Sequence, residues 1–334
     1  MPRKARIDAP GAIHHIICRG IEGQNTFWDD ADRNDFLQRL KKILPETNTP
    51  CYAWALLPNH FHLLLRTGTA PIATVMLRLL SGYAGRFNRR HRRSGHLFQN
   101  RYKSILCQEN KYLLELVRYI HLNPLRAGIV ASLEKLEHYG YCGHGILMGL
   151  RKCNWQQVDL VLSLFGKKVS AARKSYGAFI EKGIAQGKQP ELVGGGLIRS
   201  MGGWQVVKSL RHLPIHLKGD ERILGDSAFV ESVLKAQDEQ MERRHKLQTQ
   251  GYDFQKIVSR VAEIVDMKAD QILTASKQPQ RVNARSLVCY WAVKELKMKA
   301  TAVAKLLGIT QSAVTKALQR GEKWALENKL KLIE

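Results

Sequence analysis

The chain has 334 residues, enough for two domains, and carries 53 lysines and arginines against 29 aspartates and glutamates. The 44% of hydrophobic and 25% of charged residues exclude a wholly disordered or fibrous chain, and the net charge of +24 favours a polyanionic partner. No apolar run reaches the roughly 18 residues of a membrane span, and no signal core follows the basic N-terminus, so we expect a cytoplasmic protein without membrane contact. Six cysteines without a CxxC pair argue against a zinc ribbon or a disulfide framework.

Strand-like and helix-like patterns alternate over residues 1–135. Apolar patterns predict strands at 12–18, 52–57, 60–66 and 101–107, and helical periodicity predicts helices at 29–44, 72–90 and 111–122. Asp29 or Asp30 is the expected N-cap of the first helix, and Pro124 is expected to end the third. The order βαββαβα predicts an α+β fold, a ferredoxin-like sandwich with an antiparallel sheet and helices on one face.

The rest of the chain divides into two parts. Residues 136–225 include glycine runs at 194–196 and 202–203 and are expected to form a poorly defined connector to which we assign no function. Residues 226–334 predict an all-α domain, with helices at 252–265, 282–296, 299–307 and 310–320. The last two are joined at Gly308-Ile309, a pattern typical of a helix-turn-helix.

Two histidines follow the turn Leu57-Pro58-Asn59. His60 and His62 are two residues apart on a predicted strand, so both side chains point to one face of the sheet. Neutral imidazole nitrogens that converge in this way can hold a divalent metal ion. The pair alone is weak evidence, and exposed or hydrogen-bonded histidines are the alternative.

A tyrosine and an asparagine share one face of the helix predicted at 111–122. Tyr119 and Asn123 are one turn apart, and Tyr112 lies near the same stripe. A tyrosine at the edge of an amphipathic helix is most often a packing residue. The pattern alone therefore does not identify a nucleophile.

The segments PNHFHLLL and RYIHLNPLRAG, with HHIICRG, FWDDADRNDFLQRL and GHLFQNRYKSIL, resemble the REP-associated tyrosine transposases, a group of the single-tyrosine HUH transposases. The resemblance covers about residues 10–130. It implies a ferredoxin-like nuclease that cleaves and rejoins single-stranded hairpin DNA through a covalent phosphotyrosine. It further implies that Tyr119 is the nucleophile and that His60, His62 and Asn123 bind Mg²⁺ or Mn²⁺. Such a protein is expected to be nucleoid-associated, as a monomer or a homodimer.

Basic residues gather where acidic ones are missing. No aspartate or glutamate occurs between Glu46 and Glu109, which predicts a surface for the DNA backbone, with a merely solvated cationic surface as the alternative. The expected contacts are Arg86, Arg89, Arg90, Arg92, Arg93, Arg101 and Lys103. The aromatic residues Trp54, Phe98 and Tyr102 are candidates either for base stacking or for the core.

Residues 252–320 resemble the duplex-binding C-terminal domain of the replication initiator DnaA, over the segments IVSRVAEIVDMKADQILTASKQPQRVNARSLVCYWAVKEL and TAVAKLLGITQSAVTKALQR. The initiator's recognition segment is replaced here by Thr310-Gln311-Ser312-Ala313-Val314, so its target sequence is not assumed. The resemblance implies binding to flanking duplex DNA. The expected groove contacts are Gln311, Ser312, Thr315, Lys316 and Arg320, with Arg281 and Arg285 on phosphates. The alternative is a helical bundle for protein contacts.

Two other functions remain open for the first domain. One is a catalytically inactive DNA- or RNA-binding regulator on the same fold. The other is a metal-dependent phosphoesterase that uses water, which would leave hydrolysed ends and no protein–DNA adduct.

Overall fold

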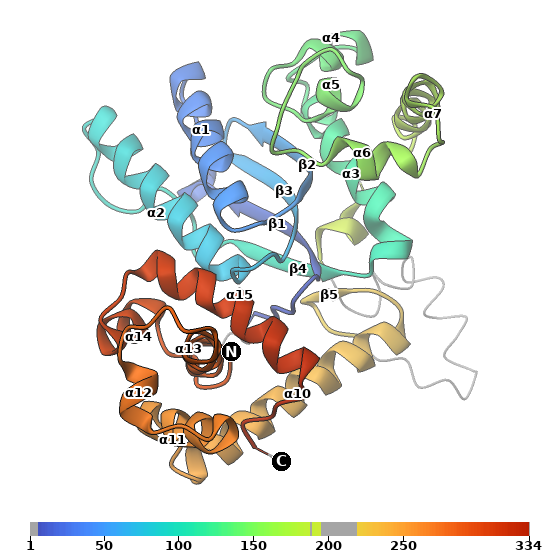
Figure 1. Cartoon of the computed structure of the whole chain (residues 1–334). Helices are drawn as coiled ribbons and strands as arrows, with labels where there is room; N and C mark the ends of the chain where they lie inside the picture. Colours follow the sequence, from blue (N-terminus) through green and yellow to red (C-terminus); the bar gives the residue numbers. More distant parts are fainter. Residues whose placement is uncertain (1–5, 188, 195–218, 334) are drawn as a thin grey trace. The chain divides into compact units, whose positions relative to one another are not determined.

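The computed structural model describes residues 6–187, 189–194 and 219–333 (Figure 1). Of the glycine runs, the residues at 195, 196, 202 and 203 lie outside the described residues. The chain forms two compact units, Met1–Val233 and Leu234–Glu334. In the described ranges, no helix combines the length and the apolar character that crossing a membrane requires.

A five-stranded sheet organises the first unit. Its strands are β1 (Ile13–Arg19), β2 (Cys51–Leu57), β3 (His60–Arg66), β4 (Lys103–Cys107) and β5 (Ile223–Leu224), in the order β2-β3-β1-β4-β5. The first four strands pair antiparallel, as expected for the ferredoxin-like α+β fold. The two residues of β5, which no sequence pattern marked, pair parallel with β4.

Helices cover both faces of this sheet (Figure 1). On one face, α1 (Asp30–Glu46) and α2 (Ile72–Arg90) share a core with Ile16, Phe61 and Leu63. On the other, α3 (Glu109–Arg126) packs against Ala55 and Leu64. The expectation of helices on a single face was therefore wrong. All seven residues of β2 are buried, and a strand buried on both sides needs a cover on each.

The helix ends follow local chemistry. Asp29 caps α1, because its carboxylate accepts a hydrogen bond from the backbone N–H of Asp32 at 3.0 Å. Pro124 does not end α3, which continues to Arg126. Proline removes one helical hydrogen bond, but the buried Ile120 and Leu122 hold this part of the helix on the sheet.

The expected connector packs, where it is described, within the first unit. It contributes the helices α4 (Leu133–His138), α5 (His144–Leu147), α6 (Val158–Ser163) and α7 (Val169–Lys182), and the 3-10 turn η2 (Pro190–Val193). Another 3-10 turn, η1 (Ile21–Gly23), lies outside the connector and follows β1. Tyr176 of α7 and Leu192 of η2 belong to the same core as α3. The Tyr176 hydroxyl lies 2.8 Å from Nδ1 of His121 and 2.8 Å from Nδ1 of His144, which ties α7 to α3 and α5.

The second unit is all-α, as expected. The helix α10 (Ser227–Thr249) begins in the first unit and is followed by α11 (Phe254–Val265), α12 (Ala269–Leu273), α13 (Pro279–Lys294), α14 (Ala300–Leu307) and α15 (Gln311–Glu327). Gly308 has φ +63° in the turn between α14 and α15, and Thr310 caps α15. Gly321 lets α15 approach α13, because a Cβ there would lie 2.1 Å from the Ser286 carbonyl oxygen.

Candidate active site

The two histidines of the PNHFH segment lie on the sheet face that α3 covers. In β3, His62 is opposite Ile17 of β1 and Ala55 of β2, and His60 is opposite Arg19. Opposed residues of antiparallel strands point to the same face, and Ala55 belongs to the core that includes α3. His62 is 3% exposed, while His60 is half-buried near the end of the strand.

The structure brings Tyr119 to these histidines within a single chain. The ring centroid of Tyr119 lies 5.7 Å from that of His62, edge-on, and the ring centroids of His60 and His62 are 5.2 Å apart. A third histidine, His15 of β1, lies 5.2 Å from His62 and 5.9 Å from Tyr119. Sequence reasoning did not single out His15, because it lies within the mostly apolar strand segment at 12–18.

One nitrogen of each histidine in the PNHFH segment is already engaged. Asn59 donates through Nδ2 to the Gly23 carbonyl, so its Oδ1 is the atom that faces Nδ1 of His60 at 2.7 Å. An amide oxygen only accepts, so His60 carries its proton on Nδ1 and keeps a lone pair on Nε2. Nδ1 of His62 lies 2.9 Å from Nε2 of His15.

All three histidines are neutral at pH 7. Burial lowers the pKa of His60 to about 4, with a smaller effect from nearby Arg19. Burial also lowers the pKa of His15 to about 4 and that of His62 well below its usual value. Neutral imidazole is the form that binds a metal ion.

Asn123 lies one helical turn after Tyr119 and is 9% exposed. Its Nδ2 is buried without a hydrogen-bond partner in the described residues, so no neighbouring group there fixes the amide. No group of three or more histidine, cysteine, aspartate or glutamate side chains in those residues is placed to hold a metal ion. The resemblance implies two imidazole nitrogens, of His60 and His62, and the amide oxygen of Asn123 as ligands, and side chains of these types can coordinate a divalent ion.

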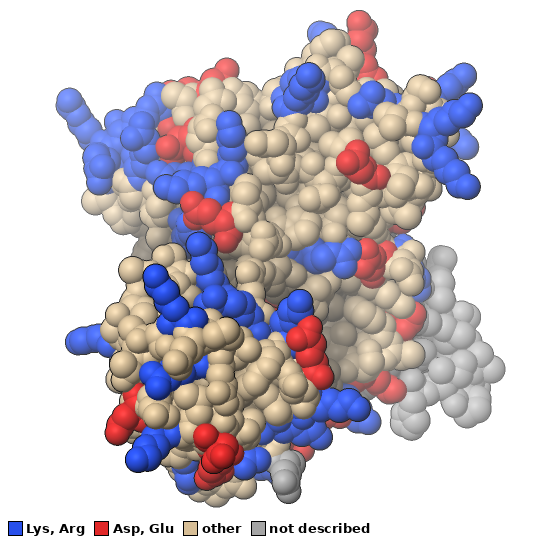
Figure 2. Space-filling view, viewed as in Figure 1, with Lys and Arg blue, Asp and Glu red and all other residues tan. Residues whose placement is uncertain are grey.

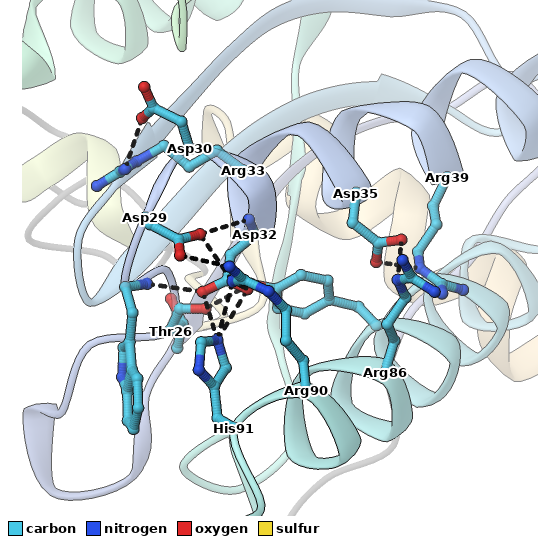
Figure 3. A network of polar contacts seen from close by, with 12 residues as sticks. Thr26, Asp29, Asp30, Asp32, Arg33, Asp35, Arg39, Arg86, Arg90 and His91 are labelled. Atoms are coloured by element: carbon cyan, nitrogen blue, oxygen red, sulfur yellow. Dashed lines mark hydrogen bonds and ion pairs between the residues drawn. The ribbon is translucent and has the colours of Figure 1, made fainter.

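The basic residues at the end of α2 fall into two groups, and Figure 3 shows Arg86 and Arg90 of the first. Carboxylates of α1 pair with the first group: Arg90 with Asp29 and Asp32, and Arg86 with Asp35 at 3.1 Å. The second group is exposed. Arg89 and Arg92 form no ion pair with any described residue.

The other basic residues expected on DNA differ in their surroundings. Arg93 lies over the ring of Phe87 with its Cζ 5.7 Å from the centroid. Arg101 is exposed, and Lys103 is exposed but donates from Nζ to the Val193 carbonyl at 2.6 Å. Figure 2 shows lysine and arginine side chains gathered over α1 and α2 on the face that it draws.

The aromatic candidates for base stacking belong to the core. Trp54 is 1% exposed and donates to Gln156, Tyr102 is 8% exposed, and Phe98 packs on Phe61. By contrast, the ring of Trp28 is 53% exposed. In the sequence, Trp28 is marked only by its position directly before Asp29, the N-cap of α1, which does not indicate an exposed ring.

The residues expected on duplex DNA lie mainly on α15. Its exposed face carries Gln311, Ser312, Thr315, Lys316 and Arg320, whereas Val314, Ala317 and Gly321 are buried. Arg281 is half-buried. Arg285 donates to the Leu307 carbonyl at 3.2 Å, so in this structure it caps the end of α14.

Comparisons with known proteins bear on the first unit. Residues 10–123 match the family described as "Transposase IS200 like". A solved structure titled "Structure of the REP associates tyrosine transposase bound to a REP hairpin" is similar at 15% identity and a TM-score of 0.38, over 47% of this chain and 93% of that chain. No curated protein matches, and the family match does not reach the second unit. Over residues 10–123, the chain is therefore similar to the IS200-like transposases.

Proposed function

We propose that the protein is a metal-dependent DNA endonuclease and strand transferase of the transposase type. It cleaves and rejoins single-stranded hairpin DNA through a covalent bond between Tyr119 and the DNA. The observation that carries this proposal is the ring of Tyr119, edge-on to His62 at 5.7 Å, next to two imidazoles with engaged Nδ1 atoms. Both sides of the site come from one chain, so a monomer contains all of its residues.

The residues divide the chemistry between them. Bound by His60, His62 and Asn123, Mg²⁺ or Mn²⁺ supplies positive charge that neutralises a phosphate oxygen. The Tyr119 oxygen bonds to the phosphorus as the bond to the DNA 3′ oxygen breaks, and the phenol proton passes to that leaving oxygen, which becomes a free 3′-OH. Because a phenolate is a better leaving group than an alkoxide, a 3′-OH can reverse the step and reseal the strand.

Labelled single-stranded hairpin DNA with Mn²⁺, resolved on a denaturing gel, tests this proposal. We expect Tyr119→Phe to remove the covalent adduct, while Tyr112→Phe on the same helix keeps it. His62→Ala should abolish cleavage but retain most DNA binding, because the phosphate contacts lie elsewhere. An adduct formed by Tyr119→Phe would refute the choice of nucleophile. Hydrolysed ends without an adduct would favour the phosphoesterase, and DNA binding without cleavage the inactive regulator.

We also propose that the second unit binds flanking duplex DNA. The exposed polar face of α15 supports this role, since it carries Lys316 and Arg320 on one side of a helix whose other side is buried. Replacing both by alanine should weaken duplex binding. It should also reduce by about 2 the salt slope, which is the steepness with which the logarithm of the binding constant falls with the logarithm of the salt concentration. Lys331→Ala, a control beyond the end of α15, removes another exposed lysine and should change neither. Unchanged duplex affinity in the double variant would favour a bundle for protein contacts.

A further inference from the structure

His15 connects the candidate active site to a segment far along the chain. Its Nδ1 lies 3.0 Å from the carbonyl oxygen of Leu192, and its Nε2 lies 2.9 Å from Nδ1 of His62. His15 is fully buried, and the Leu192 side chain is 4% exposed. The family match ends at residue 123, so η2 lies outside the part that the family describes.

This chain of contacts fixes the position of each proton. A carbonyl oxygen only accepts, so Nδ1 of His15 must carry the proton that it donates to Leu192. A second proton on Nε2 would make His15 a buried cation, and no described acidic residue forms an ion pair with it. His15 Nε2 is therefore an acceptor, and His62 donates to it from Nδ1. The proton on Nδ1 leaves a lone pair on Nε2 of His62.

We propose that His15, oriented by the Leu192 carbonyl, is a positioning residue that holds His62 in the tautomer whose Nε2 can bind the divalent ion. The proposal rests on the metal site of the proposed function. It extends the active site to η2, whose Val193 carbonyl also accepts a hydrogen bond from Lys103 of β4. Mutation of a residue that hydrogen-bonds to the second nitrogen of a metal-binding histidine typically weakens metal affinity by about 10- to 100-fold.

Two conservative variants separate the two contacts of His15. In His15→Asn, the short amide nitrogen replaces Nδ1 and keeps the contact to Leu192 but loses the one to His62. In His15→Gln, the longer amide replaces Nε2 and its oxygen can accept from His62. We expect Mn²⁺ titrated into the metal-free protein to bind about 10- to 100-fold more weakly to His15→Asn and nearly normally to His15→Gln. His14→Asn, a buried histidine of β1 on the opposite face, is the control and should bind normally.

A spectroscopic readout separates positioning from a merely structural role. In metal-free protein labelled with ¹⁵N-histidine, long-range proton–nitrogen spectra report which nitrogen of His62 is protonated, and His62→Ala assigns the signal. We expect Nδ1–H in the natural protein and a shift towards Nε2–H in His15→Asn. Normal Mn²⁺ affinity and an unchanged tautomer in His15→Asn would overturn the proposal for His15. If His62→Ala itself leaves Mn²⁺ binding unchanged, the metal site of the proposed function fails instead.

A separate observation concerns Trp28, which is exposed yet firmly held. Its backbone N–H donates to Asp32 at 2.9 Å, and its ring lies 4.3 Å from that of His91 and 5.5 Å, edge-on, from that of Phe87. His91 and Phe87 belong to the end of α2 that also carries the exposed Arg89 and Arg92. An exposed aromatic ring beside cationic side chains is the arrangement by which proteins bind unpaired bases.

We infer that Trp28 stacks on an unpaired base of the bound DNA, while Arg89 and Arg92 contact phosphates. This inference rests on the DNA substrate of the proposed function. Stacking on one base contributes about 1–3 kcal/mol, which corresponds to a roughly 5- to 150-fold change in affinity. Stacking releases no counterions, whereas each phosphate contact adds about 0.7 to the salt slope on a single strand.

Fluorescence anisotropy over a salt series distinguishes the two contributions. Trp28→Ala should lower affinity for a hairpin with an unpaired tail at an unchanged salt slope, whereas the double variant Arg89→Ala, Arg92→Ala should lower the slope. Leu77→Ala, which truncates a side chain of α2 that is 66% exposed, is the control and should bind normally. Unchanged affinity in Trp28→Ala, or an equal loss on a fully paired duplex, would overturn the inference. Absence of binding by the natural protein would refute the DNA substrate itself.

Discussion

Replacing Asp32 by asparagine is expected to destabilise the first unit strongly. The Asp32 side chain is 2% exposed and accepts from the Trp28 backbone at 2.9 Å, from Arg90 at 2.6 Å and from His91 at 2.9 Å (Figure 3). Asparagine keeps the shape but loses the charge, and its amide group turns a donor towards other donors. Hydrogen bonds to charged groups contribute about 1.5–3 kcal/mol each. The Arg90 side chain is 38% exposed, so solvent screens its interaction with Asp32 and reduces the contribution of that pair to stability.

We therefore expect Asp32→Asn to lower the free energy of unfolding by about 2–3 kcal/mol, which is roughly 5–10 °C in Tm for a unit of this size. Thermal unfolding followed by near-ultraviolet circular dichroism measures this change. Asp30→Asn is the matched control on the same helix, because its side chain is 74% exposed and its ion pair with Arg33 lies at the surface. A Tm for Asp32→Asn within 2 °C of the control would refute the reasoning.

Three further outcomes are expected elsewhere in the chain. Gly321→Ala should destabilise the second unit by about 1–3 kcal/mol in urea, because the added methyl group meets the Ser286 carbonyl, while adduct formation on a minimal hairpin stays unchanged. Burial lowers the pKa of His144 to about 4, so the unfolded chain binds a proton that the folded chain excludes, and stability falls as the pH drops from 6.5 to about 4. His144→Asn should remove up to about 3 kcal/mol of that loss, measured by urea unfolding at pH 7 and pH 4.5. A chain ending at Gly149 lacks Tyr176 and Leu192 of the α3 core, and we expect it to lose cooperative unfolding and adduct formation; retention of both would contradict the packing described above.

Local patterns predicted most of the regular structure. The expected bounds 60–66 and 72–90 are those of β3 and α2, because both segments have a clear apolar period and a turn at each end. The α+β class is confirmed, and residues 10–123 match the family described as "Transposase IS200 like". The strand β5 has two residues, too few to show any period, and it pairs with β4 more than a hundred positions away.

The remaining features depend on contacts between distant segments. The stretch between Glu46 and Glu109 contains no acidic residue, yet Arg90 is paired, because α1 brings Asp29 and Asp32 to α2. The bond from His15 to the Leu192 carbonyl joins residues 177 positions apart, and a backbone acceptor leaves no mark in a sequence. The metal ligands, the nucleophile and the resemblance of residues 252–320 to the initiator stay predictions.

The strand pairing at the outer strands of the sheet limits how copies of the chain can join. Residues 141–157 lie along β2, where the Leu56 N–H donates to the Tyr141 carbonyl and the Gln157 N–H to that of Cys51. At the outer side of β4, β5 pairs with Leu106 and Cys107. An unpaired edge is where a second chain can add a strand, and such edges promote domain swapping and fibre growth. A second copy would therefore have to displace one of these segments before it could pair along the full length of β2 or β4.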